Sequence, residues 1–440
     1  MKSNLRQRSR YQRISKELFW VILGQFASFL GSIFLVRVLT EKLDPTEYGE
    51  LGLGLTIAAL VYQVVNGGIN NSIGRFYSIA IEKKDFDGYL RASFRMLFWA
   101  TLVVISFTIL FMSVLKLLEL EKWIWLSLVV LIFSVLSSYN NALNALQNAA
   151  RQRIVVALHG GMNSWLKIGL AIIIMFWLGK NSIAVVVGYV ISALIVILSQ
   201  IIFLKRLILK QTSLVKDQTS QLKENWLKQM WKFSWPFSTW GLFTWAQLVS
   251  DRWAIEWFST TAEVGQFVVV YQLGYASISM LTKTTMTLIG PILYERSGDA
   301  KDSIRNLSVN RISWRITFAS LTLSILSFIF TYYLHDWLFS ILVAESFREA
   351  SHFLPWVVLA GGLFATAQML SLKVLSELRS NSLIAIKIIT ALIAVFTNII
   401  GAWLFGLSGV VAALVFFSLI YLVWMMILAK NSSFNEYSTN

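Results

Sequence analysis

Residues 182–204 read SIAVVVGYVISALIVILSQIIFL, an apolar stretch without a single charged side chain. A helix needs about 20 residues to cross a hydrocarbon core of ~30 Å, so this stretch is long enough to span a membrane. A strand would leave its backbone hydrogen-bonding groups unpaired in lipid, and the polar–apolar alternation of a barrel strand is absent. The stretch therefore predicts a transmembrane α-helix.

Similar apolar stretches recur along the whole chain. Of its 440 residues, 56% are hydrophobic and only 14% are charged, whereas a soluble domain carries roughly 25% charged residues. We therefore predict an all-α polytopic membrane protein with 12 transmembrane helices. The predicted spans are residues 17–39, 48–73, 93–115, 123–148, 154–178, 182–204, 233–258, 264–290, 312–334, 353–375, 382–405 and 408–429.

The basic residues are concentrated in every second link between these spans. This pattern is the positive-inside bias, and it predicts that both termini are cytoplasmic. The net charge of +15 is thereby explained by membrane orientation, which argues against nucleic-acid binding. Residues 17–39 are too long for a signal peptide and lack a small-residue cleavage site, so we interpret them as a retained span.

Several kinds of chemistry lack the residues that they need. The chain has no cysteine, and its three histidines, His159, His335 and His352, lack metal-ligand spacing. No phosphate-binding Gly-Lys-Ser/Thr loop and no pair of carboxylates within a span can be found. The sequence therefore predicts no metal, no cofactor, no direct use of ATP and no enzymatic activity.

The chain divides into two related halves. A polar, basic linker at 205–232 separates an N-terminal lobe of six spans (1–204) from a C-terminal lobe of six spans (233–440). Residues 44–49 (DPTEYG) and 260–265 (TTAEVG) both have the pattern of a helix start, with an oxygen-bearing N-cap followed by Glu. Six spans per copy predict a parallel repeat around a central cleft, although chance recurrence of capping sequences is an alternative.

Lys167 is the strongest candidate for a functional residue. It lies near the middle of span 154–178, where an ionisable side chain costs at least ~2.5 kcal/mol and is expected to face a cavity or a partner. His159 and Asn163 precede it at four-residue intervals, so the three share one helix face. The alternative is a structural lysine bonded to carbonyl groups of a neighbouring helix.

Two arginines occupy matching places near the outer ends of spans 1 and 7. If Arg37 and Arg252 face inward, they form a pair of cations at the outer mouth of the cleft, although either could extend to the membrane surface. Asp251 is a candidate for ion coupling, although it could simply pair with its neighbour. It shares a helix face with Trp240 and Gln247, which could contact a sugar or merely pack.

Polar residues within other spans complete the candidates. Asn70 in span 2 and Asn144 in span 4 could line the cleft or form hydrogen bonds between helices. Lys283 in span 8 could reach the cleft. Lys373 and Lys387 lie closer to span ends, so contact with lipid headgroups is expected for them. We found no deep cluster of acidic residues, and the buried charge predicts an anionic cargo.

The sequence also resembles a known family. Arg37-Val38-Leu39, followed by the stretch 44–49 at the start of span 2, resembles the Arg-x-Leu-Gly-Pro-x-x-Tyr/Phe-Gly signature of polysaccharide-export (Wzx-type) flippases. These belong to the multidrug/oligosaccharidyl-lipid/polysaccharide exporter superfamily. Twelve spans in two lobes of six agree with that family over nearly the whole chain.

The resemblance implies a flippase of the bacterial cytoplasmic (inner) membrane. Its cargo would be an undecaprenyl-diphosphate-linked oligosaccharide for O-antigen, capsule or exopolysaccharide, moved by rocking of the two lobes. Lys167, Arg37 and Arg252 would then attract the diphosphate or acidic sugars, and the Asn and Trp residues would contact sugars. The implied partners are this lipid-linked oligosaccharide, membrane lipids, and the polymerase and chain-length proteins of the pathway, with the chain acting as a monomer.

Two other functions remain open at this point. An ion-coupled exporter of cationic compounds could have the same fold, and it would depend on Asp251 rather than on Lys167. A membrane oligosaccharide polymerase would need a catalytic carboxylate or a large outer loop, and neither is evident.

Overall fold

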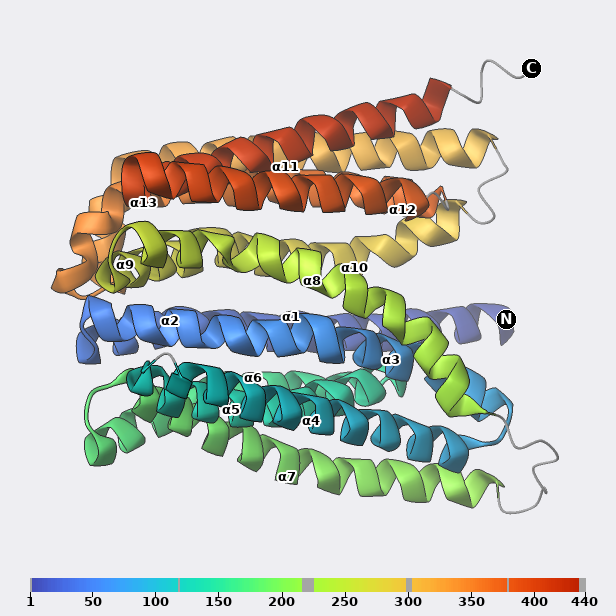
Figure 1. Ribbon diagram of the computed structural model, residues 1–440. Coiled ribbons are helices and arrows are strands. Elements are labelled where there is room, and N and C mark those ends of the chain that lie inside the picture. Colours follow the sequence, from blue (N-terminus) through green and yellow to red (C-terminus); the bar gives the residue numbers. More distant parts are fainter. Residues whose placement is uncertain (1, 118, 216–224, 298–302, 378–379, 435–440) are drawn as a thin grey trace. The chain divides into compact units, whose positions relative to one another are not determined.

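The computed structural model describes residues 2–117, 119–215, 225–297, 303–377 and 380–434, and every regular element in these ranges is helical (Figure 1). The elements of the first half are α1 (Lys2–Lys42), α2 (Pro45–Leu60), η1 (Val61–Asn66), α3 (Gly67–Glu82), α4 (Phe86–Leu117), α5 (Glu121–Ala149), α6 (Arg153–Leu178) and α7 (Ser182–Val215). Those of the second half are α8 (Trp226–Phe258), α9 (Thr261–Tyr271), η2 (Gln272–Ala276), α10 (Ser277–Ser297), α11 (Ser303–Leu342), η3 (Glu345–Phe353), α12 (Leu354–Ser376) and α13 (Ser380–Phe434).

The prediction of an all-α polytopic membrane protein is confirmed. Ten helices of the described chain are long and apolar enough to cross a membrane. The count of ten is two lower than the twelve predicted spans. Predicted spans 11 and 12 both lie within α13 and are counted as one helix, which accounts for the first difference. Predicted span 7 lies within α8, whose uncharged part at 233–250 is rich in Trp, Ser and Thr and therefore has low hydropathy.

The two arms of α13 form a helical hairpin with almost no connecting loop. Gly406 has φ 57° and ψ −135°, a conformation that interrupts the helix and that glycine adopts more readily than other residues. The backbones of Gly401 and Gly409 touch, although eight residues of continuous helix would hold them about 12 Å apart. The chain therefore reverses at Gly406.

The chain forms two compact units. Unit 1 consists of Met1–Leu35 and Leu53–Trp245, and unit 2 of Val36–Gly52 and Ala246–Asn440. Packing thus assigns the end of α1 and the start of α2 to unit 2, and the first part of α8 to unit 1. The lobe boundaries at 204 and 233 follow from the polar, basic linker in the sequence, and they stay a prediction.

Each unit has its own apolar core. In unit 1, α5 packs against α3, α4 and α7, and one buried cluster includes Tyr89, Leu146 and Trp226. In unit 2, α11, α12 and α13 lie side by side, with α12 the most buried of the three (Figure 1). Leu370 and Met425 are fully buried in the contact of α12 with α13.

Both predicted helix starts form in the structure. The Asp44 carboxylate accepts a hydrogen bond from the Glu47 amide at 2.9 Å, and the Thr260 hydroxyl accepts one from the Glu263 amide at 3.2 Å. Each cap satisfies one of the unpaired amides at the start of its helix.

The helices that follow these two caps cross at a pair of glycines inside unit 2. A Cβ added at Gly49 would overlap the carbonyl oxygen of Thr261, and one added at Gly265 would overlap that of Pro45. The offset from Gly49 to Gly265 equals that from Pro45 to Thr261, so the contact is reciprocal between the two sequence copies. Only glycine allows the backbones to approach so closely.

Candidate functional site

The ammonium group of Lys167 contacts two aromatic rings inside unit 1. Its Nζ is 5.0 Å from the ring centre of Phe133 on α5 and 5.2 Å from that of Tyr189 on α7. Both rings are buried, and their centres are 5.8 Å apart. An ammonium group near an aromatic face is attracted by the ring quadrupole, more strongly when water is excluded. Neighbouring helices therefore supply the partner expected for a lysine in mid-span.

The rest of the Lys167 face packs against the same neighbours. His159 is buried, with Nδ1 2.7 Å from the Val155 carbonyl and Nε2 3.0 Å from the Ser199 hydroxyl on α7. The Asn163 carbonyl accepts a hydrogen bond from Ser192 on α7, whereas its side-chain oxygen is buried and unpaired among the described residues. The contacts of His159 fit a structural role, whereas Asn163 retains an unused acceptor.

The amides of spans 2 and 4 differ in their bonding. Asn144 accepts a hydrogen bond from Gln200 on α7 at 2.9 Å, which is the interhelical contact expected of a packing residue. Both amide atoms of Asn70 are buried, and neither is hydrogen-bonded within the part of the chain that the structure describes. Of the two, Asn70 is the one with free hydrogen-bonding capacity.

In unit 2, Asp251 and Arg252 lie together inside the bundle. Asp251 is 2% exposed, and its carboxylate accepts a hydrogen bond from the Arg252 amide at 2.7 Å. The Arg252 guanidinium is 5.0 Å from the ring centre of Tyr271. Tyr271 in turn stacks on Tyr275 of η2, with centres 4.9 Å apart. The local contact between Asp251 and Arg252 is therefore a hydrogen bond from the backbone, and not an ion pair of the two side chains.

Polar groups of α13 belong to the same interior, and sequence reasoning missed them. The Asn398 amide donates to the Ser250 hydroxyl at 2.9 Å, and its oxygen is buried and unpaired among the described residues. The Tyr421 hydroxyl is likewise buried without a hydrogen bond in the described ranges, and it acts electrostatically on Tyr275. A polar residue within an apolar span is the sequence signal that could have identified Asn398. The sequence does not show that Asn398 contacts Ser250 on α8.

The predicted sugar-contacting face of α8 is divided between the units. Trp240 belongs to unit 1 and Gln247 to unit 2, because the division falls at Trp245. Both side chains are half-buried.

The lysines near the span ends differ in their exposure. Lys283 on α10 is exposed, and Lys387 on α13 is half-buried. Contact of Lys373 with headgroups was a wrong prediction: this residue is 1% exposed and donates to the Ala429 carbonyl of α13, because α12 is enclosed by its neighbours.

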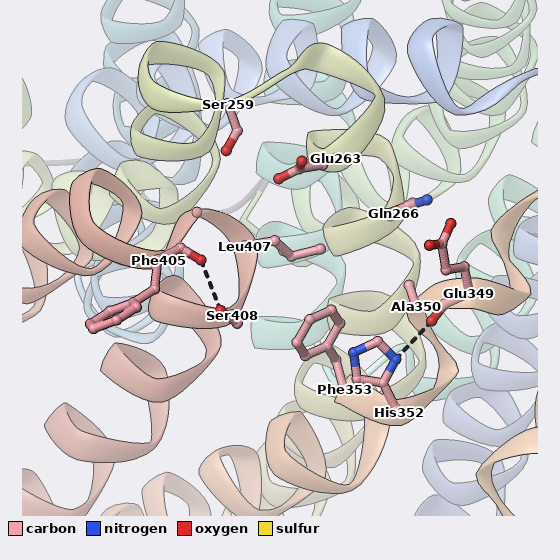
Figure 2. A pocket seen from close by; sticks show the side chains of 11 residues that line it. Ser259, Glu263, Gln266, Glu349, Ala350, His352, Phe353, Phe405, Leu407 and Ser408 are labelled. Carbon is pink, nitrogen blue, oxygen red and sulfur yellow. Dashed lines mark hydrogen bonds between the residues drawn. The ribbon is translucent and has the colours of Figure 1, made fainter.

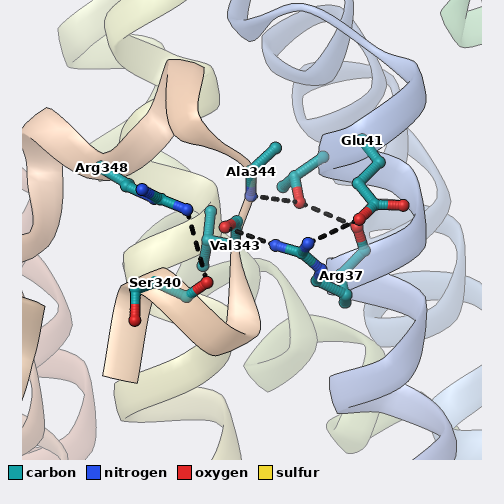
Figure 3. Close-up of polar contacts among 7 residues, drawn as sticks. Arg37, Glu41, Ser340, Val343, Ala344 and Arg348 are labelled. Carbon is teal, nitrogen blue, oxygen red and sulfur yellow. Dashed lines mark hydrogen bonds and ion pairs between the residues drawn. The ribbon is translucent and has the colours of Figure 1, made fainter. Parts of the chain in front are cut away.

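Arg37 is engaged in a polar cluster of unit 2 (Figure 3). Its guanidinium donates to the Val343 carbonyl at 2.6 Å and pairs with Glu41 at 2.6 Å. The Thr40 hydroxyl accepts a hydrogen bond from the Ala344 amide at 3.2 Å. These contacts join the end of α1 to the link between α11 and η3. They use two nitrogen atoms of the guanidinium that was predicted to attract cargo.

A surface pocket of about 420 Å³ also lies in unit 2, and the sequence did not reveal it (Figure 2). It is formed by the link between α8 and α9, by η3, and by the turn of α13, three links that the span order predicts on one side of the membrane. Its polar lining includes Ser259, Glu263, Gln266, Glu349, His352 and Ser408.

The matches to known proteins agree with this architecture. Residues 14–295, more than half of the chain, match the family model described as "Polysaccharide biosynthesis protein". The chain belongs to this family. No match was found among curated protein sequences.

Solved structures similar to this polysaccharide biosynthesis protein are transporters. An inward-facing multidrug resistance transporter of the MATE family, in the MOP superfamily, matches with a TM-score of 0.67 and 17% identity, covering 94% of this chain and 96% of the other. The outward-facing form of such a transporter matches with a TM-score of 0.59 and 17% identity, covering 96% and 97%. A MOP transporter from Pyrococcus furiosus matches with a TM-score of 0.60 and 16% identity, covering 94% and 96%. The polysaccharide biosynthesis protein therefore has the fold of MOP-superfamily transporters.

The spans contain several groups that could contact a ligand. Among the described residues, no three His, Cys, Asp or Glu side chains are grouped to hold a metal ion. The groups present are a cation beside two aromatic rings, a buried carboxylate, and amides with unused hydrogen-bonding atoms. Such groups can hold a charged or hydroxyl-rich ligand.

Proposed function

We propose that this protein is a flippase that moves a lipid-linked oligosaccharide, carried on undecaprenyl diphosphate, across the bacterial cytoplasmic membrane for surface polysaccharide synthesis. The observation that carries the proposal is a polysaccharide-biosynthesis sequence on a transporter fold. A protein of this family with some ten apolar helices is suited to moving a polysaccharide precursor across the bilayer.

The charges within the spans support an anionic cargo. Lys167 lies on a span without a carboxylate, so its positive charge can attract a diphosphate or an acidic sugar. Arg252 could serve similarly in unit 2, whereas Arg37 would first have to release Glu41. The unused amide atoms of Asn70 and Asn163 are suited to sugar hydroxyl groups. In this proposal Asp251 is the candidate for ion coupling.

A second function is favoured by one observation. Asp251 is a deeply buried carboxylate, which an exporter of cationic compounds would need. The family model that matches the chain is one of polysaccharide biosynthesis proteins, so we rank this function below the first.

Transport by purified protein in proteoliposomes tests the proposal. A fluorescent lipid-linked oligosaccharide should become accessible on the opposite leaflet in the presence of the wild-type protein, and Lys167→Ala should reduce the rate at least tenfold. Lys180→Ala, at an exposed position in the link that follows the same helix, is the control and should retain the wild-type rate. Transport of cationic dyes that depends on Asp251, without oligosaccharide transport, would favour the second function instead.

A further inference from the structure

Lys167 is the only residue with a formal charge in the apolar part of four helices of unit 1. Residues 18–35 of α1, 123–149 of α5 and 182–204 of α7 contain no Asp, Glu, Lys or Arg, and Lys167 is alone in 154–178 of α6. These helices are its neighbours: α6 packs on α7 and α5, and α1 approaches α6 at Gly24 and Gly31. None of these four apolar segments therefore supplies a counter-ion to its ammonium group.

The titratable groups that face this region are few. Tyr189 on α7 contributes its ring, and His159 on α6 lies two turns away with both ring nitrogens close to hydrogen-bonding partners. The α5 wall contributes Phe133, which does not titrate. Lys205 and Arg206 are at the far end of α7, about four turns from Tyr189. Contact with two rings is thus the interaction that the described residues provide for the ammonium group.

A lysine in such a place has two usable states. Its ammonium form can be held by the rings or by an anion of the cargo, and its neutral amine form can rest in apolar surroundings without a partner. An arginine would have only the first state, because a guanidinium does not lose its proton in proteins. The use of lysine at this position is therefore chemically distinct from a permanent positive charge.

We propose that Lys167 is a proton-carrying group of the transport cycle. The ammonium pairs with the anionic part of the cargo. When the cargo leaves, the ammonium gives its proton to water, leaves a neutral amine between Phe133 and Tyr189, and is reprotonated before the next cargo binds. Unit 1 would then couple proton movement to transport independently of Asp251 in unit 2. This inference rests on the proposed function for its cargo.

The Lys167→Arg variant separates proton carrying from the roles of a fixed cation. It keeps a positive charge that cannot be lost, so the response of transport to a proton gradient can be compared with that of the wild type. In proteoliposomes, a proton gradient should speed wild-type transport at least fivefold and speed the variant less than twofold. Lys180→Arg, a conservative change at an exposed position in the link after α6, should respond as the wild type does.

A second measurement needs no cargo, so it distinguishes failure of this inference from failure of the proposed function. Lysines methylated with ¹³C-formaldehyde give signals whose positions report protonation, and the signal missing from Lys167→Arg belongs to Lys167. The chemical shift of that signal should change from the value of an ammonium group to the value of an amine across the pH range in which transport is measured. A signal that stays that of an ammonium throughout, or a Lys167→Arg variant that responds fully to the gradient, would overturn the proposal.

Discussion

The two units hold a half-buried cation in different surroundings. In unit 1, Lys167 has aromatic rings as neighbours and no carboxylate in the adjoining spans. In unit 2, Arg252 also lies against an aromatic ring, but the buried carboxylate of Asp251 is next to it in the sequence. A buried charge without a partner is costly, and pairing it removes much of that cost. Unit 1 therefore holds its cation by aromatic contact among spans without a carboxylate, whereas unit 2 has a carboxylate next to its cation in the sequence.

Removal of an aromatic ring beside Lys167 should have the largest effect on stability. Phe133→Ala deletes a buried ring and its cation contact, and we expect a loss of about 3–5 kcal/mol, measured by thermal unfolding in detergent. Phe176→Ala on α6 is the control, because that side chain is 84% exposed and should change stability by under about 0.5 kcal/mol. Equal effects of the two changes would contradict the placement of Phe133.

Removal of the compensating cation in unit 2 should have the next largest effect. Arg252→Gln leaves Asp251 buried without its neighbouring positive charge, and we expect a loss of about 2–3 kcal/mol in unfolding experiments. Arg206→Gln is the matched control, since Arg206 also lies over a ring, that of Phe203, but is exposed. It should cost no more than about 1 kcal/mol. A larger loss for the exposed arginine would refute the compensation argument.

Neutralising the carboxylate should have a smaller effect on stability. Asp251→Asn keeps an oxygen that can accept the hydrogen bond of the Arg252 amide, so we expect a loss of about 1 kcal/mol. Asp251→Leu removes that acceptor and should cost more, which a comparison of the two thermal unfolding curves will reveal. If both variants unfold alike, the hydrogen bond at this site contributes little.

The smallest effect is expected when only a hydroxyl group is removed from the Lys167 environment. Tyr189→Phe retains the ring that faces the ammonium, so the free energy of unfolding should change by under about 0.5 kcal/mol. The melting temperature in detergent measures this change. Tyr189→Leu removes the aromatic face and should be clearly less stable. A large loss in Tyr189→Phe would indicate that the hydroxyl, rather than the ring, is the important group.

The fold was predictable from the sequence because each span has a strong local signal. Span 182–204 identifies itself by length and hydropathy alone, and the predicted spans all lie within helices of the structure. The turn at Gly406 was placed within two residues, because a glycine in a short gap between two apolar runs favours a break. The α8 segment is weaker by hydropathy, and the length of its uncharged run was what identified it.

The site was only partly predictable, because side-chain partners come from other helices. Position within a span identified Lys167, but nothing in the sequence names Phe133 and Tyr189 as its neighbours. The contact of Arg37 with the Val343 carbonyl joins residues far apart in the chain. Lys373 was misplaced for the same reason: proximity to a span end does not reveal whether a neighbouring helix covers the side chain. Which cations meet cargo remains a prediction for the variants above.

The α13 hairpin has a consequence for the biogenesis of the protein. From Ile388 to Ala429 the chain contains no charged residue, and the two arms are joined at Gly406 without a polar loop. Moving one elementary charge across the membrane potential costs about 2.3 kcal/mol per 100 mV, and a charged loop adds the cost of leaving water. Insertion of this hairpin carries neither cost. The last two spans should therefore enter the bilayer as one apolar body, at a rate that does not change when the membrane potential is collapsed.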